Sequence, residues 1–105
     1  MLLSLGPPII KLTRTEFTVN VTDSVTFICN TEAYPSVTSL VWQKEVDGVT
    51  TSINSGYMKT SLTLTNVDMD DSGQYRCLAR NAEGSANMSF TLKVTTGNIH
   101  LITLK

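Results

Sequence analysis

The amino-acid sequence predicts an all-β fold. Apolar residues recur at every second position in several short segments, which is the period of a half-buried strand. Clusters of Gly, Pro, Asn and Asp separate these segments, as turn residues do between successive strands. Charged residues make up 16% of the chain and serine and threonine are abundant, which suits strands with one solvent-facing side. With 105 residues, the chain has room for one domain with a single core.

The N-terminal third is predicted to contain two edge strands and one core strand. Proline is tolerated at the start of an edge strand, so the edge strands are placed at residues 9–11, after Gly6-Pro7-Pro8, and at residues 16–19. The core strand starts at Ser24 and turns alternate residues inward, namely Val25, Phe27 and Cys29. A turn cluster, residues 33–36, then reverses the chain.

The middle of the chain is predicted to form a hairpin and a further core strand. Residues 39–44 alternate, with Leu40 and Trp42 inward and Val41 and Gln43 outward. Asp47-Gly48 is a type I′ hairpin signal, and residues 49–51 form the returning strand. After a break at residues 54–56, residues 60–65 place Leu62 and Leu64 on one face.

The last third is predicted to be a second hairpin. Its first strand, residues 74–80, turns Tyr75, Cys77 and Ala79 inward. Gly84 fits a left-handed bulge position at the end of the loop. The final strand has the cleanest alternation in the chain, so a one-residue slip would expose its whole apolar set and its register is firmly fixed. That inward set is Ala86, Met88, Phe90, Leu92 and Val94.

The segment Asp71-Ser72-Gly73-Gln74-Tyr75-Arg76-Cys77 follows Cys29 and Trp42 in an order that resembles the immunoglobulin superfamily. The resemblance covers residues 7–94 and implies an immunoglobulin-like two-sheet Greek-key sandwich. It implies a disulfide between Cys29 and Cys77 that joins the sheets, with Trp42 packed on it. It also implies that the Tyr75 hydroxyl bonds back to the chain at a corner, with Asp71, Gly73 and Leu64 in the core motif. Such a disulfide persists only in an oxidising compartment.

The number of residues between the predicted strands also bears on which immunoglobulin subset the chain resembles. Only about fifteen residues separate Lys44 from Thr60, too few for the extra hairpin of variable-type domains. The chain therefore resembles the intermediate (I) set, which is common in cell-adhesion molecules, receptor ectodomains and sarcomeric giants. Many members of the family pair the motif aspartate with an arginine, but this chain has no arginine between Val46 and Leu62. Asp71 is left either to cap the corner or to pair with Lys59.

Composition and motifs argue against several classes of function. The net charge of −1 provides no field for nucleic acid or an anionic membrane, and direct membrane insertion by this segment is not expected. A nucleophile needs a base within reach, but the one histidine, His100, lies in the tail, so an enzyme is not expected. Asp68, Asp70 and Asp71 lack calcium-loop spacing. The sequence thus predicts no catalytic residue, metal or cofactor.

The resemblance implies a binding surface on the outward side of the strands that carry Trp42, Cys77 and Phe90. The predicted partner-binding residues are Val41, Gln43, Gln74, Arg76, Leu78 and Arg80, joined on that side by Thr91. Two apolar residues among hydrogen-bonding ones fit an interface with a small apolar centre. The loop tips at Tyr34-Pro35 and at residues 81–84 are a second candidate. The partner is another protein, an immunoglobulin-like domain or an extracellular ligand, with a homodimer among the options.

Two Asn-x-Ser/Thr sequons give candidate glycosylation sites at Asn20 and Asn87. With 7 asparagines and 26 serines and threonines in 105 residues, chance alone gives about 1.7 sequons. The sequons are therefore compatible with secretion and little more. Asn20 lies near a turn, and a glycan on Asn87 would shield part of the outward face.

Residues 1–6 are interpreted as a linker or the remnant of a cut from a longer protein, and residues 95–105 as a linker or the start of a following segment. The predicted function is that of a non-catalytic protein-binding module in a cell-surface, single-pass membrane or secreted protein, for homophilic or heterophilic recognition. Two alternatives stay open: a ligand-binding module of a receptor tyrosine kinase ectodomain, and a structural spacer in a sarcomeric-type giant protein.

Overall fold

The computed structural model describes residues 5–53, 56 and 58–97. These residues form nine strands and one short 3-10 helix. In chain order the elements are β1 (Gly6–Ile10), β2 (Glu16–Asn20), β3 (Val25–Ile28), β4 (Thr31–Tyr34), β5 (Ser39–Val46), β6 (Val49–Ile53), β7 (Ser61–Leu64), η1 (Met69–Asp71), β8 (Gly73–Asn81) and β9 (Gly84–Thr95).

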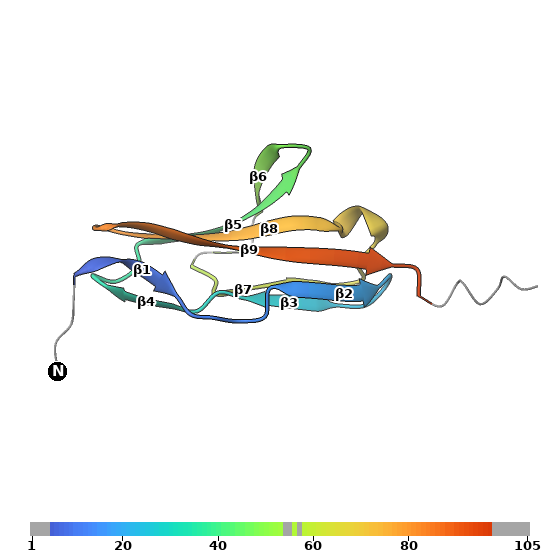
Figure 1. Cartoon of the computed structure of the whole chain (residues 1–105), viewed down its shortest axis with the longest axis horizontal. Helices are drawn as coiled ribbons and strands as arrows, with labels where there is room; N and C mark the ends of the chain where they lie inside the picture. The colour runs from blue at the N-terminus through green and yellow to red at the C-terminus, as the bar shows by residue number, and fades with distance from the viewer. Residues whose placement is uncertain (1–4, 54–55, 57, 98–105) are drawn as a thin grey trace, which may run out of the picture.

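The strands form two layers (Figure 1). One layer is a five-stranded sheet in the order β2-β9-β8-β5-β6, and the other contains the pairs β1–β4 and β3–β7. Cys29 and Asn30 interrupt what is otherwise one strand, β3 and β4. Across this interruption the Cys29 amide donates to the Thr60 carbonyl at 2.7 Å, and the Lys11 amide donates to the Asn30 carbonyl at 2.8 Å. The two pairs therefore continue one another, and the predicted two-sheet sandwich is confirmed.

Strand β9 holds the larger sheet together. It pairs antiparallel with the whole of β8, from Gly84 opposite Asn81 to Leu92 opposite Gly73, and parallel with β2, from Glu16 opposite Thr91 to Asn20 opposite Thr95. Phe90, Leu92 and Val94 are buried, and the residues between them are exposed. The alternation predicted for this strand is confirmed, because one side of β9 faces the other layer and the other side faces solvent.

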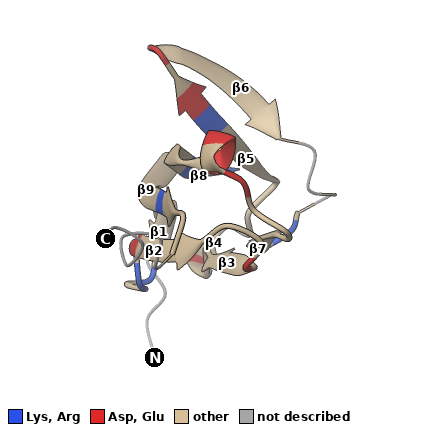
Figure 2. Ribbon diagram, turned by 90° about the vertical axis from the view of Figure 1, so that its right-hand side faces the viewer, with Lys and Arg blue, Asp and Glu red and all other residues tan. Residues whose placement is uncertain are grey.

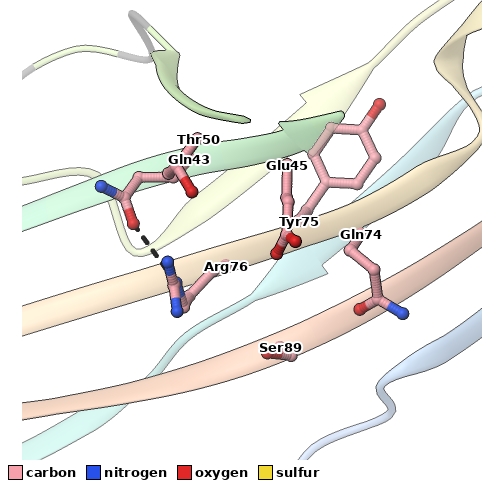
Figure 3. Close-up of a pocket in the computed structure, with 7 residues that line it drawn as sticks. All are labelled: Gln43, Glu45, Thr50, Gln74, Tyr75, Arg76 and Ser89. Atoms are coloured by element: carbon pink, nitrogen blue, oxygen red, sulfur yellow. Dashed lines mark hydrogen bonds between the residues drawn. The ribbon is translucent and has the colours of Figure 1, made fainter. Parts of the chain in front are cut away.

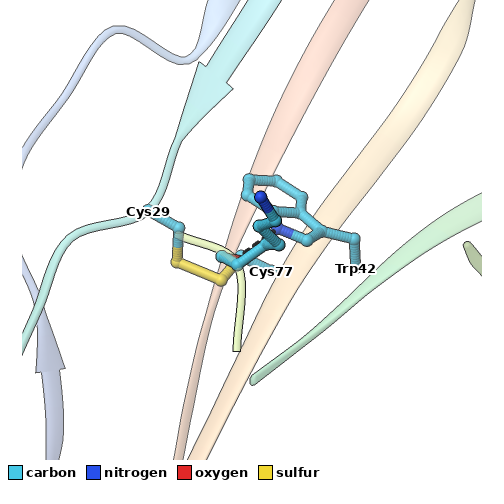
Figure 4. Close-up of a disulfide and its surroundings, with 4 residues drawn as sticks. Cys29, Trp42 and Cys77 are labelled. Carbon is cyan, nitrogen blue, oxygen red and sulfur yellow. Dashed lines mark hydrogen bonds between the residues drawn. A yellow bond between two sulfur atoms is a disulfide. The ribbon is translucent and has the colours of Figure 1, made fainter. Parts of the chain in front are cut away.

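The core is built around the disulfide and an aromatic cluster. Cys29 and Cys77 are bonded, with their Cα atoms 6.5 Å apart, and both are fully buried beside Trp42 (Figure 4). The Trp42 indole Nε1 donates a hydrogen bond to the Lys59 carbonyl at 3.0 Å, which satisfies its one polar atom. Phe27 lies at the centre of the aromatic cluster. Its ring centroid is 5.1 to 6.3 Å from those of Phe17, Tyr75, Phe90 and Trp42.

The predicted corner before β8 is confirmed in detail. The Tyr75 hydroxyl donates to the Asp71 carbonyl oxygen at 2.5 Å. Asp68 and Asp71 form a reciprocal capping box around η1, in which the Asp71 carboxylate accepts from the Asp68 amide at 2.8 Å. Asp71 therefore caps the corner, the first of its two predicted roles. Gly73 follows at φ +147°, a conformation that favours glycine.

Leu64 keeps its predicted inward direction on β7, although it is half-buried and packs against the core rather than inside it. The hairpin between β5 and β6 also follows the prediction, with φ values of +52° at Asp47 and +79° at Gly48. The β5 and β6 strands both run further than expected, to Val46 and Ile53.

Three local predictions are wrong. The first edge strand, predicted at residues 9–11, instead spans Gly6–Ile10, so the two prolines lie inside β1. The sequence predicts that residues 33 and 34 open a turn, but they end β4, where Tyr34 pairs with Gly6 of β1, and the chain reverses only at the cis Tyr34-Pro35 bond. The pairing surface supplied by β1 overrides the local turn preference. Gly84 is not left-handed helical: it begins β9 at φ +151° and pairs with Asn81. The Asn81 side chain closes this two-residue turn by accepting from the amides of Glu83 and Gly84. The predicted break at residues 54–56 lies mostly outside the described residues.

Candidate functional site

The candidate site is the outward side of β5, β8 and β9, called the front face below. Strand pairing brings all six predicted partner-binding residues together on it, because residues directly opposite each other on paired strands, and every second residue along each strand, point to the same side. Val41 lies opposite Leu78, and Gln43 lies opposite Arg76. Gln74 and Arg80 continue the same side of β8 at its two ends.

The apolar centre of the front face is the pair Val41 and Leu78. Both side chains are half-buried, and they are direct cross-strand partners. On β9, Asn87 lies opposite Leu78, so a polar residue borders the pair on that side. A small apolar centre with a polar border is the pattern of a protein interface.

The polar end of the front face is partly preorganised. Arg76 Nε donates to Gln43 Oε1 at 3.3 Å, and Gln74 Nε2 donates to Thr91 Oγ1 at 3.1 Å. Around these side chains lies a shallow depression of about 20 Å³ (Figure 3). It is lined by Gln43, Glu45, Thr50, Gln74, Tyr75, Arg76 and Ser89. Small-molecule sites are typically several hundred Å³, so this depression suits ordered water at a protein interface.

Sequence reasoning missed Glu45 and Thr50 as lining residues. Glu45 lies one residue beyond the predicted end of its strand, and Thr50 lies within the predicted returning strand, directly opposite Glu45. Glu45 is two residues after Gln43 on β5 and therefore points to the same side, and Thr50 shares that side as its cross-strand partner. The alternation of β5, continued by two residues, was the available signal. Figure 2 shows the charged residues of β5 beside the acidic 3-10 helix. The Lys44 ammonium there donates to the Asp70 carbonyl at 2.8 Å.

Tyr75 lies under the depression and is almost fully buried. Burial raises the pKa of the Tyr75 phenol to about 12, because the charged phenolate would lose its hydration, and the Asp71 carboxylate adds to the effect. Tyr75 is therefore neutral at physiological pH and acts as a hydrogen-bond donor to the corner.

The two loop tips that form the second candidate differ in how exposed their side chains are. Tyr34 is 50% exposed and available for contact. Asn81, by contrast, is buried and uses its amide internally: Nδ2 donates to the carbonyls of Gly6 and Pro35, each at 2.8 Å. Asn81 therefore supports the tip, and only residues 82–84 of that loop are exposed.

Both sequon asparagines have exposed side chains. Asn20 ends β2, and its Oδ1 accepts from the Thr95 hydroxyl at 2.6 Å. Asn87 lies in the middle of β9 on the front face. The two candidate acceptors are thus at different places: one at the end of the sandwich from which β9 leaves, and one inside the predicted interface.

Among the described residues, no grouping of three or more His, Cys, Asp or Glu side chains could hold a metal ion. None of the helical segments in the part of the chain described is long and apolar enough to cross a membrane. His100 lies outside the described residues.

Comparison with known proteins identifies relatives. The family model described as "Immunoglobulin domain" matches residues 7–81. The chain is 34% identical to hemicentin-1 of Mus musculus over 89 residues, which is 84% of this chain and 2% of hemicentin-1. It is 33% identical over 81 residues to neural cell adhesion molecule 1 of Bos taurus, covering 73% of this chain and 9% of that protein. The chain therefore spans only a small part of these relatives.

Solved structures share the fold. The M4 domain of titin superposes with a TM-score of 0.70 at 29% identity, covering 89% of this chain and all of that one. A structure that addresses Dscam isoform specificity gives a TM-score of 0.74 at 20% identity over 88% of this chain and 25% of its own. At that identity the second match supports the fold alone.

Proposed function

Because the chain belongs to the immunoglobulin domain family, we propose that it is a non-catalytic protein-binding module of an extracellular adhesion or receptor protein, and that it binds through the front face. The relatives support the adhesion part of the proposal, since one of them is a neural cell adhesion molecule. Residues 7–94 would be the binding unit, and the flanking segments would connect it to the rest of a longer protein.

The observation that carries the proposal is the Val41–Leu78 pair. A solvent-facing strand side is normally polar, and here two adjacent strands place aliphatic side chains directly opposite each other. Gln43, Gln74, Arg76 and Arg80 extend from this pair in both directions along the strands. A few central apolar contacts supply most of the affinity at such interfaces, and surrounding polar groups exclude water and set the register.

Self-association is the simplest form of this binding to test. We would measure sedimentation of the chain without glycans over a concentration series, together with Leu78→Arg. Reversible association that is lost in Leu78→Arg supports homophilic binding by the front face. The matched control is Ile28→Arg, which adds the same charge at a 41% exposed position on β3, in the opposite layer.

A chain that is monomeric at every concentration would exclude self-association and direct the search to an unlike protein ligand, again compared with Leu78→Arg. The proposal fails if association or ligand binding survives both Leu78→Arg and Val41→Glu in folded variants. It also fails if Ile28→Arg abolishes binding to the same extent.

A specific observation favours one alternative. The titin M4 domain matches over its entire length, so a load-bearing spacer role is compatible with this fold. A ligand-binding module of a receptor tyrosine kinase ectodomain would use the same front face and give the same results in the experiment above. Dependence of stability on the disulfide separates the spacer role from the extracellular ones.

A further inference from the structure

Asn87 lies beside the apolar centre of the front face. Strand pairing puts it opposite Leu78, and Leu78 in turn lies opposite Val41, so the three residues form one row across β9, β8 and β5. The side chains of directly opposite residues are only about 5 Å apart at Cβ. A group attached to the Asn87 amide therefore begins within contact distance of Leu78.

The surroundings of Asn87 leave room for a bulky substituent. Its side chain is exposed, and its neighbours on the same side of β9 are the small residues Ser85 and Ser89. Its amide takes part in none of the side-chain hydrogen bonds of the described residues, so a modification there breaks no contact of the fold. Ser89 also completes the sequon Asn87-Met88-Ser89.

We propose that Asn87 is an N-glycosylation site and that its glycan covers the Val41–Leu78 pair, closing the front face to protein partners. In the reaction, Asn87 Nδ2 forms a bond to the anomeric carbon of an oligosaccharide. The bond from that carbon to a lipid-linked pyrophosphate breaks, and the amide releases a proton. The apolar face of the first sugar then lies over Leu78. The occupied and unoccupied forms differ in whether this face can bind, so the second half of the inference rests on the proposed function.

Asn20 provides the internal comparison. Its Oδ1 bonds to the Thr95 hydroxyl, and a glycan on Nδ2 leaves that oxygen free to keep the bond. Asn20 ends β2 at the edge of the sheet, whereas Val41 and Leu78 lie on β5 and β8. A glycan on Asn20 is therefore compatible with an open front face.

The test uses the chain secreted from cultured mammalian cells behind a cleavable signal peptide. Ser89→Ala removes the Asn87 sequon and keeps Asn87 itself. Thr22→Ala, the matched control, removes the Asn20 sequon and keeps the Asn20–Thr95 bond. Mass spectrometry after enzymatic deglycosylation gives the occupancy of each asparagine. Hydroxyl-radical footprinting then measures solvent access to Leu78, with Leu12, which is 96% exposed, as the internal reference.

We expect Asn87 to be occupied, and Leu78 to lose most of its radical modification in the glycosylated chain relative to Ser89→Ala, with Leu12 unchanged. We also expect front-face association to be weaker by about tenfold or more in the occupied form, the loss of roughly one central contact. An unmodified Asn87, or equal Leu78 modification with and without the glycan, overturns the inference. Footprinting needs no partner, so it tests the glycan position independently of binding. Failure of the proposed function alone would appear as no association in any form, while Leu78 is still protected in the glycosylated chain.

Discussion

At the scale of single residues, Tyr75 and Asn81 show how buried polar groups fix this fold. Each is almost wholly buried, and the polar atoms of each side chain are hydrogen-bonded to backbone groups. Tyr75 fixes the corner before β8 through the Asp71 carbonyl. Asn81 joins the start of β1, the loop after β4 and the β8–β9 turn. A buried polar group with all partners in place specifies one arrangement, because any alternative leaves it unpaired.

Tyr75→Phe tests the corner and its pH dependence. At neutral pH we expect Tyr75→Phe to lower the free energy of unfolding by about 1 kcal/mol, the net contribution of a buried hydrogen bond. The folded-state pKa of about 12 is above the unfolded value near 10, so the native state holds a proton that the unfolded state releases. The stabilisation from neutral Tyr75 is therefore complete below about pH 10 and is lost as the pH rises toward 12.

The measurement is urea unfolding of both proteins at rising pH. The stability gap between wild type and Tyr75→Phe should shrink above about pH 10. A gap that stays constant contradicts this account. Tyr34→Phe, at a half-exposed position, is the matched control and should change stability by less than about 0.5 kcal/mol.

Asn81→Asp is an isosteric test of the second residue. The new carboxylate keeps the acceptor for the Glu83 and Gly84 amides, but it places an oxygen 2.8 Å from each of the Gly6 and Pro35 carbonyls. Buried polar atoms without donors cost about 1–3 kcal/mol, so we expect a destabilisation of that size or more by chemical denaturation. Asn87→Asp makes the same change at an exposed position, and an equal loss there would show that added charge, rather than Asn81, is the cause.

At the scale of elements, the β5–β6 hairpin and strand β4 show which local signals survive folding. Asp47-Gly48 forms the turn that its residue types predict, because both positions take the positive φ that a type I′ turn needs. Residues 33 and 34 do not follow their turn preference, because β4 pairs with β1, a strand distant in the sequence, and Tyr34 lies opposite Gly6. Turn chemistry is local and readable, whereas the presence of a pairing strand depends on the whole fold.

Gly48→Ala tests the hairpin. A Cβ at Gly48 meets no atom within 4 Å, so the expected cost of about 1 kcal/mol comes from the φ of +79° alone. Gly6→Ala is the matched control, since Gly6 also has open space around it and its φ lies outside the positive range. Thermal unfolding of the two variants gives the comparison. Equal stability of Gly48→Ala and wild type would mean that the hairpin relaxes without strain.

At the scale of the whole molecule, the alternation of inward and outward side chains along each strand made the front face predictable. Contacts between residues far apart in the sequence could not be predicted in the same way. Once Cys77 and Trp42 were assigned inward, Leu78, Arg76 and Val41 had to point outward together, and the structure places them so. The Phe27-centred packing and the role of Asn81 were not readable, because neither has a sequence spacing that identifies it. Contacts between segments 46 to 75 residues apart, such as those of Asn81, are set by the assembled sandwich.

The disulfide cross-links the two layers through side chains, and its contribution to stability bears on where the protein works. Closing a loop of 48 residues restricts the unfolded chain and contributes about 4 kcal/mol in the chain-entropy treatment. We expect the free energy of unfolding, measured with guanidinium, to be lower by about 4 kcal/mol in the presence of reductant than in its absence. The double variant Cys29→Ala with Cys77→Ala should be destabilised further than the reduced wild type, because both sulfurs are fully buried and their removal leaves cavities.

The double alanine variant is also the control, since reductant should leave its stability unchanged. Most single domains have only about 5–15 kcal/mol of total stability, so a loss of this size would leave the reduced chain marginal and would favour an oxidising, extracellular setting. A reduced chain that keeps nearly all of its stability would contradict that expectation. It would favour the spacer role, because the aromatic core around Phe27 would then be sufficient to hold the two layers together in a reducing cell.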